Sequence, residues 1–263
     1  MNAPIGVFDS GVGGLSILRA LQQALPGERF VYLADSAHAP YGERDSAFVL
    51  ARARHVLDVM RHQHGVKALV VACNTATALA IQDLRKDVPD MPILGVEPAI
   101  KPAAAQSRTK RVGVMATPAT LQSEKFQTLL QSLSGEAEFV LQGCEGLADA
   151  IEQQWQHSDD TAVRDLCERY VHAMGAFGTA PGQMDTLVLG CTHYPFAMGI
   201  LRGLVGEEVA ILETGAPVAR QTHKVLADRG LLAKGESAGG AVELLATGDA
   251  TALKHAAHMW LTP

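Results

Sequence analysis

Residues 68–77 read Ala-Leu-Val-Val-Ala-Cys-Asn-Thr-Ala-Thr, and a similar stretch returns at 186–195 as Thr-Leu-Val-Leu-Gly-Cys-Thr-His-Tyr-Pro. Each stretch predicts a short buried strand that runs into a cysteine. Cys73 aligns with Cys191 at an offset of 118 residues, and the alignment holds without a gap over the whole block. The repeat indicates two similar halves, each of which presents one thiol at the end of a strand.

Length and composition indicate a well-packed protein of about two domains. The 263 residues are 48% apolar and 19% charged, which is below the ~25% charged residues of an average soluble protein. The net charge is −6, and no basic run could follow a phosphate backbone, so we expect no nucleic-acid partner. The sequence shows neither a spanning apolar segment nor a signal-peptide pattern at its start. We therefore expect no membrane association and a cytoplasmic location.

The alternation of apolar runs with helical patterns predicts an α/β fold with mostly parallel sheets and helices on both faces. Val-Gly-Val-Met at 112–115 is similar to Ile-Gly-Val-Phe at 5–8, so the second half begins near residue 98. The segment after residue 207 is too short for a domain of its own. We predict two similar, pseudo-symmetric domains, with the active site in the cleft between them. The first is discontinuous, 1–97 with 208–263, and the second is 98–207.

We expect strands at 4–9, 30–35, 68–73, 92–98, 111–117, 137–142, 186–191, 209–213 and 242–246, and one long helical region over 147–174.

The glycine-rich turn at 11–14 raises the alternative of a dinucleotide site, because Asp35 closes the second strand where a ribose-binding acid would lie. The spacing does not fit that motif. Ser16 stands where the third glycine belongs, and Asp9 would repel a pyrophosphate. The nucleotide interpretation is therefore the weaker one.

Small polar side chains gather at the predicted carboxyl ends of the strands, where ligands bind in open α/β sheets. A small carboxylate could be held there by helix N-termini and by hydroxyl groups. Tyr41, in the loop that contains Pro40 and Gly42, is either a loop anchor or a ligand contact. The strand ends read Asp9-Ser10, Cys73-Asn74-Thr75, Thr117-Pro-Ala-Thr120 and Cys191-Thr192-His193.

The paired thiols favour inversion at carbon over other cysteine chemistry. One thiolate takes a proton from one face of a stereocentre while the opposite thiol delivers a proton to the other face. A hydrolase would need only one cysteine and a histidine. Asp9 could serve Cys73 and His193 could serve Cys191, although His193 could equally make a structural hydrogen bond, and zinc bound by Cys191 and His193 lacks further ligands.

The two remaining cysteines, Cys144 and Cys167, are interpreted as packing residues. The chain has no Cys-x-x-Cys pair, so the four cysteines form neither a disulfide framework nor a zinc ribbon.

Four motifs together resemble the aspartate/glutamate racemase family, and within it the glutamate racemases: Phe-Asp-Ser-Gly-Val-Gly-Gly (8–14), Pro-Tyr-Gly (40–42), Ala-Cys-Asn-Thr-Ala (72–76) and Gly-Cys-Thr-His-Tyr-Pro (190–195). The resemblance covers nearly the whole chain. It implies an enzyme that interconverts L- and D-glutamate without a cofactor or metal, that supplies D-glutamate for peptidoglycan, and that forms a homodimer. It also implies that Cys73 deprotonates D-glutamate and Cys191 deprotonates L-glutamate.

The same resemblance implies the substrate contacts, which are Asp9, Ser10, Tyr41, Gly42, Asn74, Thr75, Thr117, Thr120, Thr192 and His193. It also implies a catalytic-site acid eight residues after a cysteine, a spacing that Cys144 and Glu152 keep. Two stretches depart from the family pattern. Residues 145–151 are less apolar and lack a proline, and Glu213-Thr214-Gly215 stands where many relatives have Asp-Ser-Gly.

Three alternatives remain open. An aspartate racemase would share the paired cysteines, but the full Cys-Asn-Thr-Ala and Gly-Cys-Thr-His-Tyr-Pro motifs favour glutamate. A non-catalytic amino-acid or nucleotide sensor would bind a ligand without exchanging the Cα proton. A one-thiol hydrolase would be acylated at a single cysteine and would leave stereochemistry unchanged.

Overall fold

The computed structural model describes residues 3–157, 159–233 and 241–261. The chain divides into two compact units, which are described one at a time. Unit 1 consists of residues 1–96 and 215–263, and unit 2 of residues 97–214. Among the described residues, no helix combines the length and the apolar character needed to cross a membrane.

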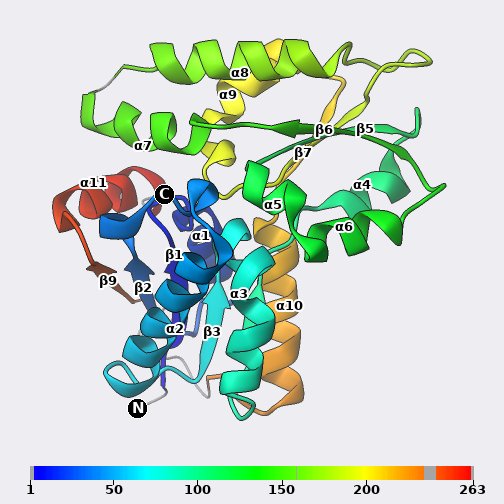
Figure 1. Cartoon of the computed structure of the whole chain (residues 1–263). Coiled ribbons are helices and arrows are strands. Elements are labelled where there is room, and N and C mark those ends of the chain that lie inside the picture. The colour runs from blue at the N-terminus through cyan, green and yellow to red at the C-terminus, as the bar shows by residue number, and fades with distance from the viewer. Residues whose placement is uncertain (1–2, 158, 234–240, 262–263) are drawn as a thin grey trace. The chain divides into compact units, whose positions relative to one another are not determined.

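Strands and helices alternate along the chain (Figure 1). The strands are β1 (Ile5–Asp9), β2 (Phe30–Ala34), β3 (Ala68–Val71), β4 (Ile93–Gly95), β5 (Arg111–Ala116), β6 (Glu138–Gly143), β7 (Thr186–Leu189), β8 (Ala210–Leu212) and β9 (Val242–Ala246). The helices are α1 (Leu15–Ala24), α2 (Ser46–His62), α3 (Asn74–Asp87), α4 (Ile100–Gln106), α5 (Pro118–Gln122), α6 (Glu124–Gln131), α7 (Leu147–His157), α8 (Thr161–Met174), α9 (Met198–Val205), α10 (Gly215–Asp228) and α11 (Ala250–Leu261). Three short 3-10 turns are η1 (Ser36–His38), η2 (Tyr41–Glu43) and η3 (Tyr194–Ala197).

The sheet of unit 1 has the strand order β4-β3-β1-β2-β9, and all its pairs are parallel. Its strands are short apolar runs, and β1, β2 and β3 are buried throughout, as expected for parallel strands covered on both faces. Helices α2 and α3 pack against each other, whereas α1 packs against α10 and α11 (Figure 1). The late strand β9 therefore extends the sheet begun by the N-terminal strands.

The sheet of unit 2 has the order β6-β5-β7-β8, again with parallel pairs. One core cluster lies under α7, α8 and α9, and another lies under α4 and α6. The prediction of an α/β fold with parallel sheets is thus confirmed in both units.

The two sheets share one topology. If β1, β2, β3 and β4 are matched with β5, β6, β7 and β8, the order β4-β3-β1-β2 corresponds strand for strand to β8-β7-β5-β6. The register also corresponds, because Phe8 pairs with Val71 in unit 1 and Met115 pairs with Leu189 in unit 2. Beyond these pairs the backbone N–H of Ala72 donates to Phe8 at 2.7 Å, and that of Gly190 donates to Met115 at 2.7 Å. The residue that follows Ala72 is Cys73 and the residue that follows Gly190 is Cys191, so the two cysteines occupy equivalent positions.

Two sequence-based expectations were wrong in detail. The chain does not leave the second unit at residue 208, because β8 pairs with β7 and keeps residues up to 214 in unit 2. The region 147–174 is two helices, α7 and α8, and not one. Asp159 accepts hydrogen bonds from the backbone N–H of Thr161 at 2.9 Å and from its hydroxyl at 2.6 Å, which favours a new helix start there. Helices α4, α9 and α11 were not among the expected elements.

Candidate active site

In unit 1 the predicted residues lie at the carboxyl edge of the sheet, where β1 and β3 run side by side. Asp9 ends β1 and is fully buried, and its carboxylate accepts a hydrogen bond from the backbone N–H of Gly11 at 3.0 Å. Gly14 closes the turn against the Asp9 side chain, since a Cβ at that position would lie 2.6 Å from the Cβ of Asp9. The glycine allows α1 to start directly behind the strand end.

Cys73 caps the N-terminus of α3. Its Sγ accepts from the backbone N–H of Ala76 at 3.4 Å and lies 3.7 Å from Oγ of Ser10, and the residue is 5% exposed. A helix N-terminus favours the thiolate form of cysteine, because its unpaired N–H groups and its dipole stabilise negative charge. Ser10 and Cys73, which are predicted site residues that follow different strands, are thus in direct contact.

Asn74 is the second buried polar group at this edge. It is 3% exposed, and neither its side-chain nitrogen nor its side-chain oxygen has a hydrogen-bond partner among the described residues. Buried amides are nearly always hydrogen-bonded, so an unpaired one indicates a place for a polar ligand. Thr75, which is also buried, follows it in the first turn of α3.

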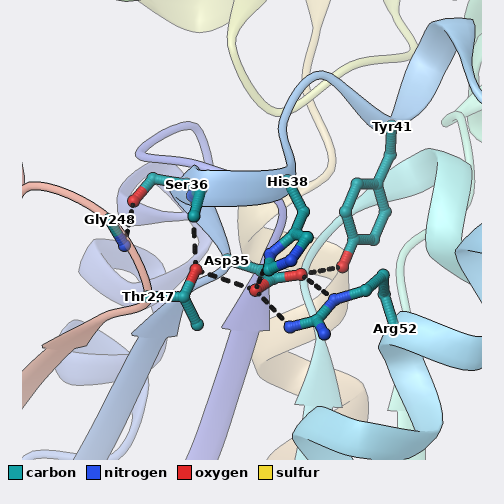
Figure 2. Close-up of polar contacts among 8 residues, drawn as sticks. Asp35, Ser36, His38, Tyr41, Arg52, Thr247 and Gly248 are labelled. Atoms are coloured by element: carbon teal, nitrogen blue, oxygen red, sulfur yellow. Dashed lines mark hydrogen bonds and ion pairs between the residues drawn. The ribbon is translucent and has the colours of Figure 1, made fainter.

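Tyr41 is buried, and its hydroxyl does not serve as a free donor. The hydroxyl donates to the carboxylate of Asp35 at 2.5 Å (Figure 2). Burial and this hydrogen bond raise the pKa of Tyr41 above its usual range. Of the two roles considered for Tyr41, the hydroxyl fits the loop anchor, while Gly42 follows in the same turn η2.

In unit 2, Cys191, His193 and Glu152 form a chain of contacts. Sγ of Cys191 lies 3.7 Å from Nδ1 of His193, and Nε2 of His193 lies 2.7 Å from Oε1 of Glu152. Cys191 and His193 are buried, and the Glu152 side chain is 24% exposed. Glu152 comes from α7 and the other two residues come from the turn after β7, so tertiary folding brings the three together.

The electrostatics of this cluster favour a protonated His193. Burial alone would lower the pKa of His193, but the hydrogen bonds to Cys191 and Glu152 and the charge of Glu152 raise it well above its ordinary value. A protonated imidazole next to a thiol stabilises the thiolate. The structural hydrogen bond considered for His193 is therefore present, and it connects the histidine to a carboxylate.

The threonines of unit 2 lie at its carboxyl edge as well. Thr117 caps α5, with its Oγ1 2.9 Å from Oγ1 of Thr120, and both residues are buried. Thr192, also buried, separates Cys191 from His193. By register Thr117 is the counterpart of Ser10, so hydroxyl groups occupy equivalent strand ends in the two units.

Cys144 and Cys167 lie in the hydrophobic core of unit 2. Burial raises the pKa of Cys144 above its usual range and that of Cys167 to about 12. Such thiols stay protonated at neutral pH and do not act as bases.

Within each unit the structure thus brings the predicted residues to one edge, and it adds partners that the sequence did not reveal. Tyr194 donates to the carbonyl of Cys144 at 3.3 Å beside the second thiol, and Tyr32 donates to the carbonyl of Gly11 at 2.8 Å beneath the glycine-rich turn. No sequence spacing links these pairs. Among the described residues, no three His, Cys, Asp or Glu side chains gather as a metal site would require.

Comparison with known proteins gives a consistent result. The sequence profile described as Asp/Glu/Hydantoin racemase matches residues 5–222. The glutamate racemase of Pseudomonas putida strain F1 is 46% identical over 253 residues, which is 96% of this chain and 92% of that protein.

Two solved structures are similar over almost the whole chain. Escherichia coli glutamate racemase, in complex with L-glutamate and the activator UDP-MurNAc-Ala, superimposes with a TM-score of 0.84 at 28% identity, covering 97% of this chain and 93% of that one. Glutamate racemase from Francisella tularensis, in complex with D-glutamate, gives a TM-score of 0.82 at 26% identity, covering 99% and 94%.

Proposed function

The chain belongs to the Asp/Glu/Hydantoin racemase family, and from this membership we propose that it interconverts L- and D-glutamate. The two solved relatives were captured with one enantiomer each, L-glutamate in one and D-glutamate in the other. The substrate is accordingly a small dicarboxylic amino acid. The observation that carries the proposal is the equivalent placement of Cys73 and Cys191 at the strand ends of two sheets with the same topology and register.

The proposed mechanism uses two thiols and no cofactor. Racemisation needs a base that removes the Cα proton from one face and an acid that returns a proton to the other. By the family resemblance, Cys73 as thiolate removes the proton of D-glutamate while Cys191 as thiol protonates the opposite face. In the reverse direction the two residues exchange roles.

Different neighbouring groups would stabilise the thiolate form of the two cysteines. Cys73 has the N-terminus of α3 and Ser10, with Asp9 ending the adjacent strand. Cys191 has His193 and, through it, Glu152. The position of Asp9 is taken in unit 2 by Ala116, so the two halves share a backbone but differ in the groups around each thiol.

Substrate binding is proposed for the polar groups at the same strand ends. The unpaired amide of Asn74 and the hydroxyls of Ser10, Thr75, Thr117, Thr120 and Thr192 offer hydrogen bonds to carboxylate and ammonium groups. Helix N-termini add positive potential for the carboxylates. Tyr41 and Gly42 are also proposed as substrate-contact residues, in the turn η2 that contains both.

We propose further that the product D-glutamate supplies peptidoglycan synthesis in the cytoplasm and that the protein is a homodimer, as the family resemblance implies. The activator of the Escherichia coli relative supports the first point, because MurNAc is a peptidoglycan sugar. Analytical ultracentrifugation tests the dimer, which predicts twice the chain mass of 27.9 kDa.

Racemisation assays on cysteine variants test the mechanism. The purified protein is incubated with L-glutamate, D-glutamate or L-aspartate without added cofactor, and optical rotation is followed. Wild type should racemise both glutamate enantiomers. Cys73→Ala and Cys191→Ala should each lose activity by at least about 10³-fold, since each removes an acid/base group that the reaction requires.

Cys167→Ala is the matched control, because this buried cysteine lies within α8 and away from the strand ends. It should keep wild-type activity. Faster turnover of aspartate than of glutamate would favour the aspartate racemase alternative. Binding of glutamate without loss of rotation would favour the sensor.

A further inference from the structure

Asp35 is a fully buried carboxylate that follows β2 and receives hydrogen bonds from four side chains (Figure 2). Arg52 donates to it twice, from Nε at 2.9 Å and from Nη2 at 2.8 Å. Tyr41 donates at 2.5 Å and Thr247 at 2.8 Å, and Nδ1 of His38 lies 3.1 Å away. Burial alone would raise the pKa of Asp35, but the hydrogen bonds and the charge of Arg52 lower it, so the group is a carboxylate.

These donors come from segments that are distant in sequence. His38 and Tyr41 belong to the segment 36–44, Arg52 to α2, and Thr247 to the residues just after β9. Asp35 therefore fastens the segment 36–44 to a helix on one side and to the end of a strand on the other.

The backbone after β9 completes the arrangement. The hydroxyl of Thr247 accepts from the N–H of Ala37 at 3.2 Å, and the N–H of Gly248 donates to Oγ of Ser36 at 3.3 Å. A Cβ on Gly248 would lie 2.9 Å from that Oγ, so the close approach depends on glycine. Thr247 and Gly248 thus contact both the backbone and the side chain at the start of segment 36–44.

The position of Asp35 carries a different kind of residue in unit 2. The backbone N–H of Asp35 donates to the backbone carbonyl of Asp9 at 2.9 Å, and in unit 2 the backbone N–H of Cys144 donates to the backbone carbonyl of Ala116 at 2.9 Å. Cys144 is therefore the counterpart of Asp35. The Cys144 thiol lies 3.5 Å from the backbone carbonyl oxygen of Gln142 and packs in the hydrophobic core. A buried carboxylate costs several kcal/mol of desolvation, and the strand end of unit 2 that corresponds to Asp35 forms with Cys144 in its place.

The segment that this carboxylate fastens is the one that carries Tyr41 and Gly42. The Tyr41 ring packs edge-on against Phe8, with centroids 6.2 Å apart, and Phe8 directly precedes Asp9. We propose that Asp35, held by Arg52 and Thr247, is a positioning residue for racemisation, which keeps segment 36–44 in the conformation that binds substrate. This inference rests on the proposed function.

The test compares Arg52→Gln with Arg54→Gln. Arg54 lies two residues away on the same helix and also pairs with an aspartate through two nitrogens, Nε at 2.8 Å and Nη2 at 3.4 Å. This pair with Asp87 is exposed and joins α2 to the last residue of α3. For Arg52→Gln we expect KM for both enantiomers to rise about tenfold while kcat stays within about twofold. In this variant substrate binding must also order segment 36–44, which weakens the binding of the substrate and of the transition state by the same amount.

Hydrogen exchange provides a readout that does not depend on activity. Amides of residues 36–44 should exchange faster in Arg52→Gln and in the near-isosteric Thr247→Val, and should be unchanged in Arg54→Gln. Thr247→Val keeps the proposal testable if Arg52→Gln folds poorly, and it should raise KM in the same direction. Tyr41→Phe should add little to the KM of Arg52→Gln, because both remove the same anchor.

Two results would overturn the inference alone: an active wild type with unchanged KM and exchange in both Arg52→Gln and Thr247→Val, or a fall in kcat at unchanged KM. A wild-type protein with no racemase activity would overturn the proposed function, and the inference with it.

Discussion

Glu152→Gln should move the pH dependence of catalysis through its effect on His193. The Glu152 carboxylate lies 2.7 Å from Nε2 of His193 and is one of the groups that raise the pKa of this histidine. Glutamine has nearly the same shape but no charge. The variant therefore removes the charge and leaves a neutral hydrogen-bond acceptor at the same place.

The size of the effect follows from the geometry. Hydrogen bonds to charged groups contribute about 1.5–3 kcal/mol, and one pKa unit corresponds to about 1.36 kcal/mol. Because glutamine keeps part of the hydrogen bond and Glu152 is partly exposed, we expect the variant to lose about 1.4 kcal/mol of the stabilisation of the charged imidazole, which lowers the pKa of His193. A histidine with a raised pKa keeps its proton up to higher pH, so the limb on which activity falls with rising pH should move to lower pH by about one unit.

The assay is the profile of kcat/KM against pH for racemisation in both directions, which reports the free enzyme. Enantiomers have equal free energy in water, so the two directions must give the same kcat/KM at each pH. Asp149→Asn is the control, because Asp149 is an exposed acid on the same helix α7 that bonds Gln153 at 2.7 Å. A Glu152→Gln profile that superimposes on that of wild type would refute the assignment of His193 and Glu152 to the preparation of Cys191.

Three further variants have separate outcomes. Asn74→Ala should lower kcat/KM at least about tenfold while leaving the melting temperature unchanged or higher, because its buried amide has no partner to lose; a large drop in melting temperature would contradict this. Gly14→Ala should destabilise the protein by about 1–3 kcal/mol, because the new methyl group would lie 2.6 Å from the Cβ of Asp9. Gly199→Ala should not destabilise it, because nothing lies within 4 Å of the new methyl group there. Equal urea midpoints of unfolding for the two variants would contradict this prediction. Burial of Asp185 opposes its ionisation, but hydrogen bonds lower its pKa to about 2. The ionised carboxylate should therefore stabilise the fold by about 2 kcal/mol above about pH 4, and this stabilisation should be lost as the pH falls from about 4 to 2. Asp185→Asn should lack this acid-dependent part of the free energy of unfolding, measured from pH 7 to 2.

The sequence predicted the framework because the relevant signals are local. The apolar runs before Cys73 and Cys191 are strands in the structure, and the repeat at the offset of 118 residues predicts the common register of β3 and β7. Residues that directly follow a parallel strand must lie at its carboxyl edge. For this reason Ser10 and Cys73 could be assigned to one site before any contact was known.

Contacts between distant elements could not be predicted in the same way. Nothing in the sequence indicates that Arg52 on α2 turns toward Asp35 or that Thr247 reaches the same carboxylate across 212 positions. Asp35 stood out only as the acid that ends a strand. The domain boundary was missed for the same reason, since a three-residue strand such as β8 can join either sheet and only its pairing with β7 decides.

The most direct test of the two-thiol account is deuterium incorporation at Cα. The protein is incubated in deuterium oxide with L-glutamate and, separately, with D-glutamate, and the loss of the Cα proton is followed by NMR alongside circular dichroism. The account predicts that wild type loses ellipticity while deuterium enters Cα, and that Cys73→Ala and Cys191→Ala do not racemise, whereas Cys167→Ala does. Racemisation that survives the loss of either Cys73 or Cys191, or no exchange at Cα by wild type, would contradict it.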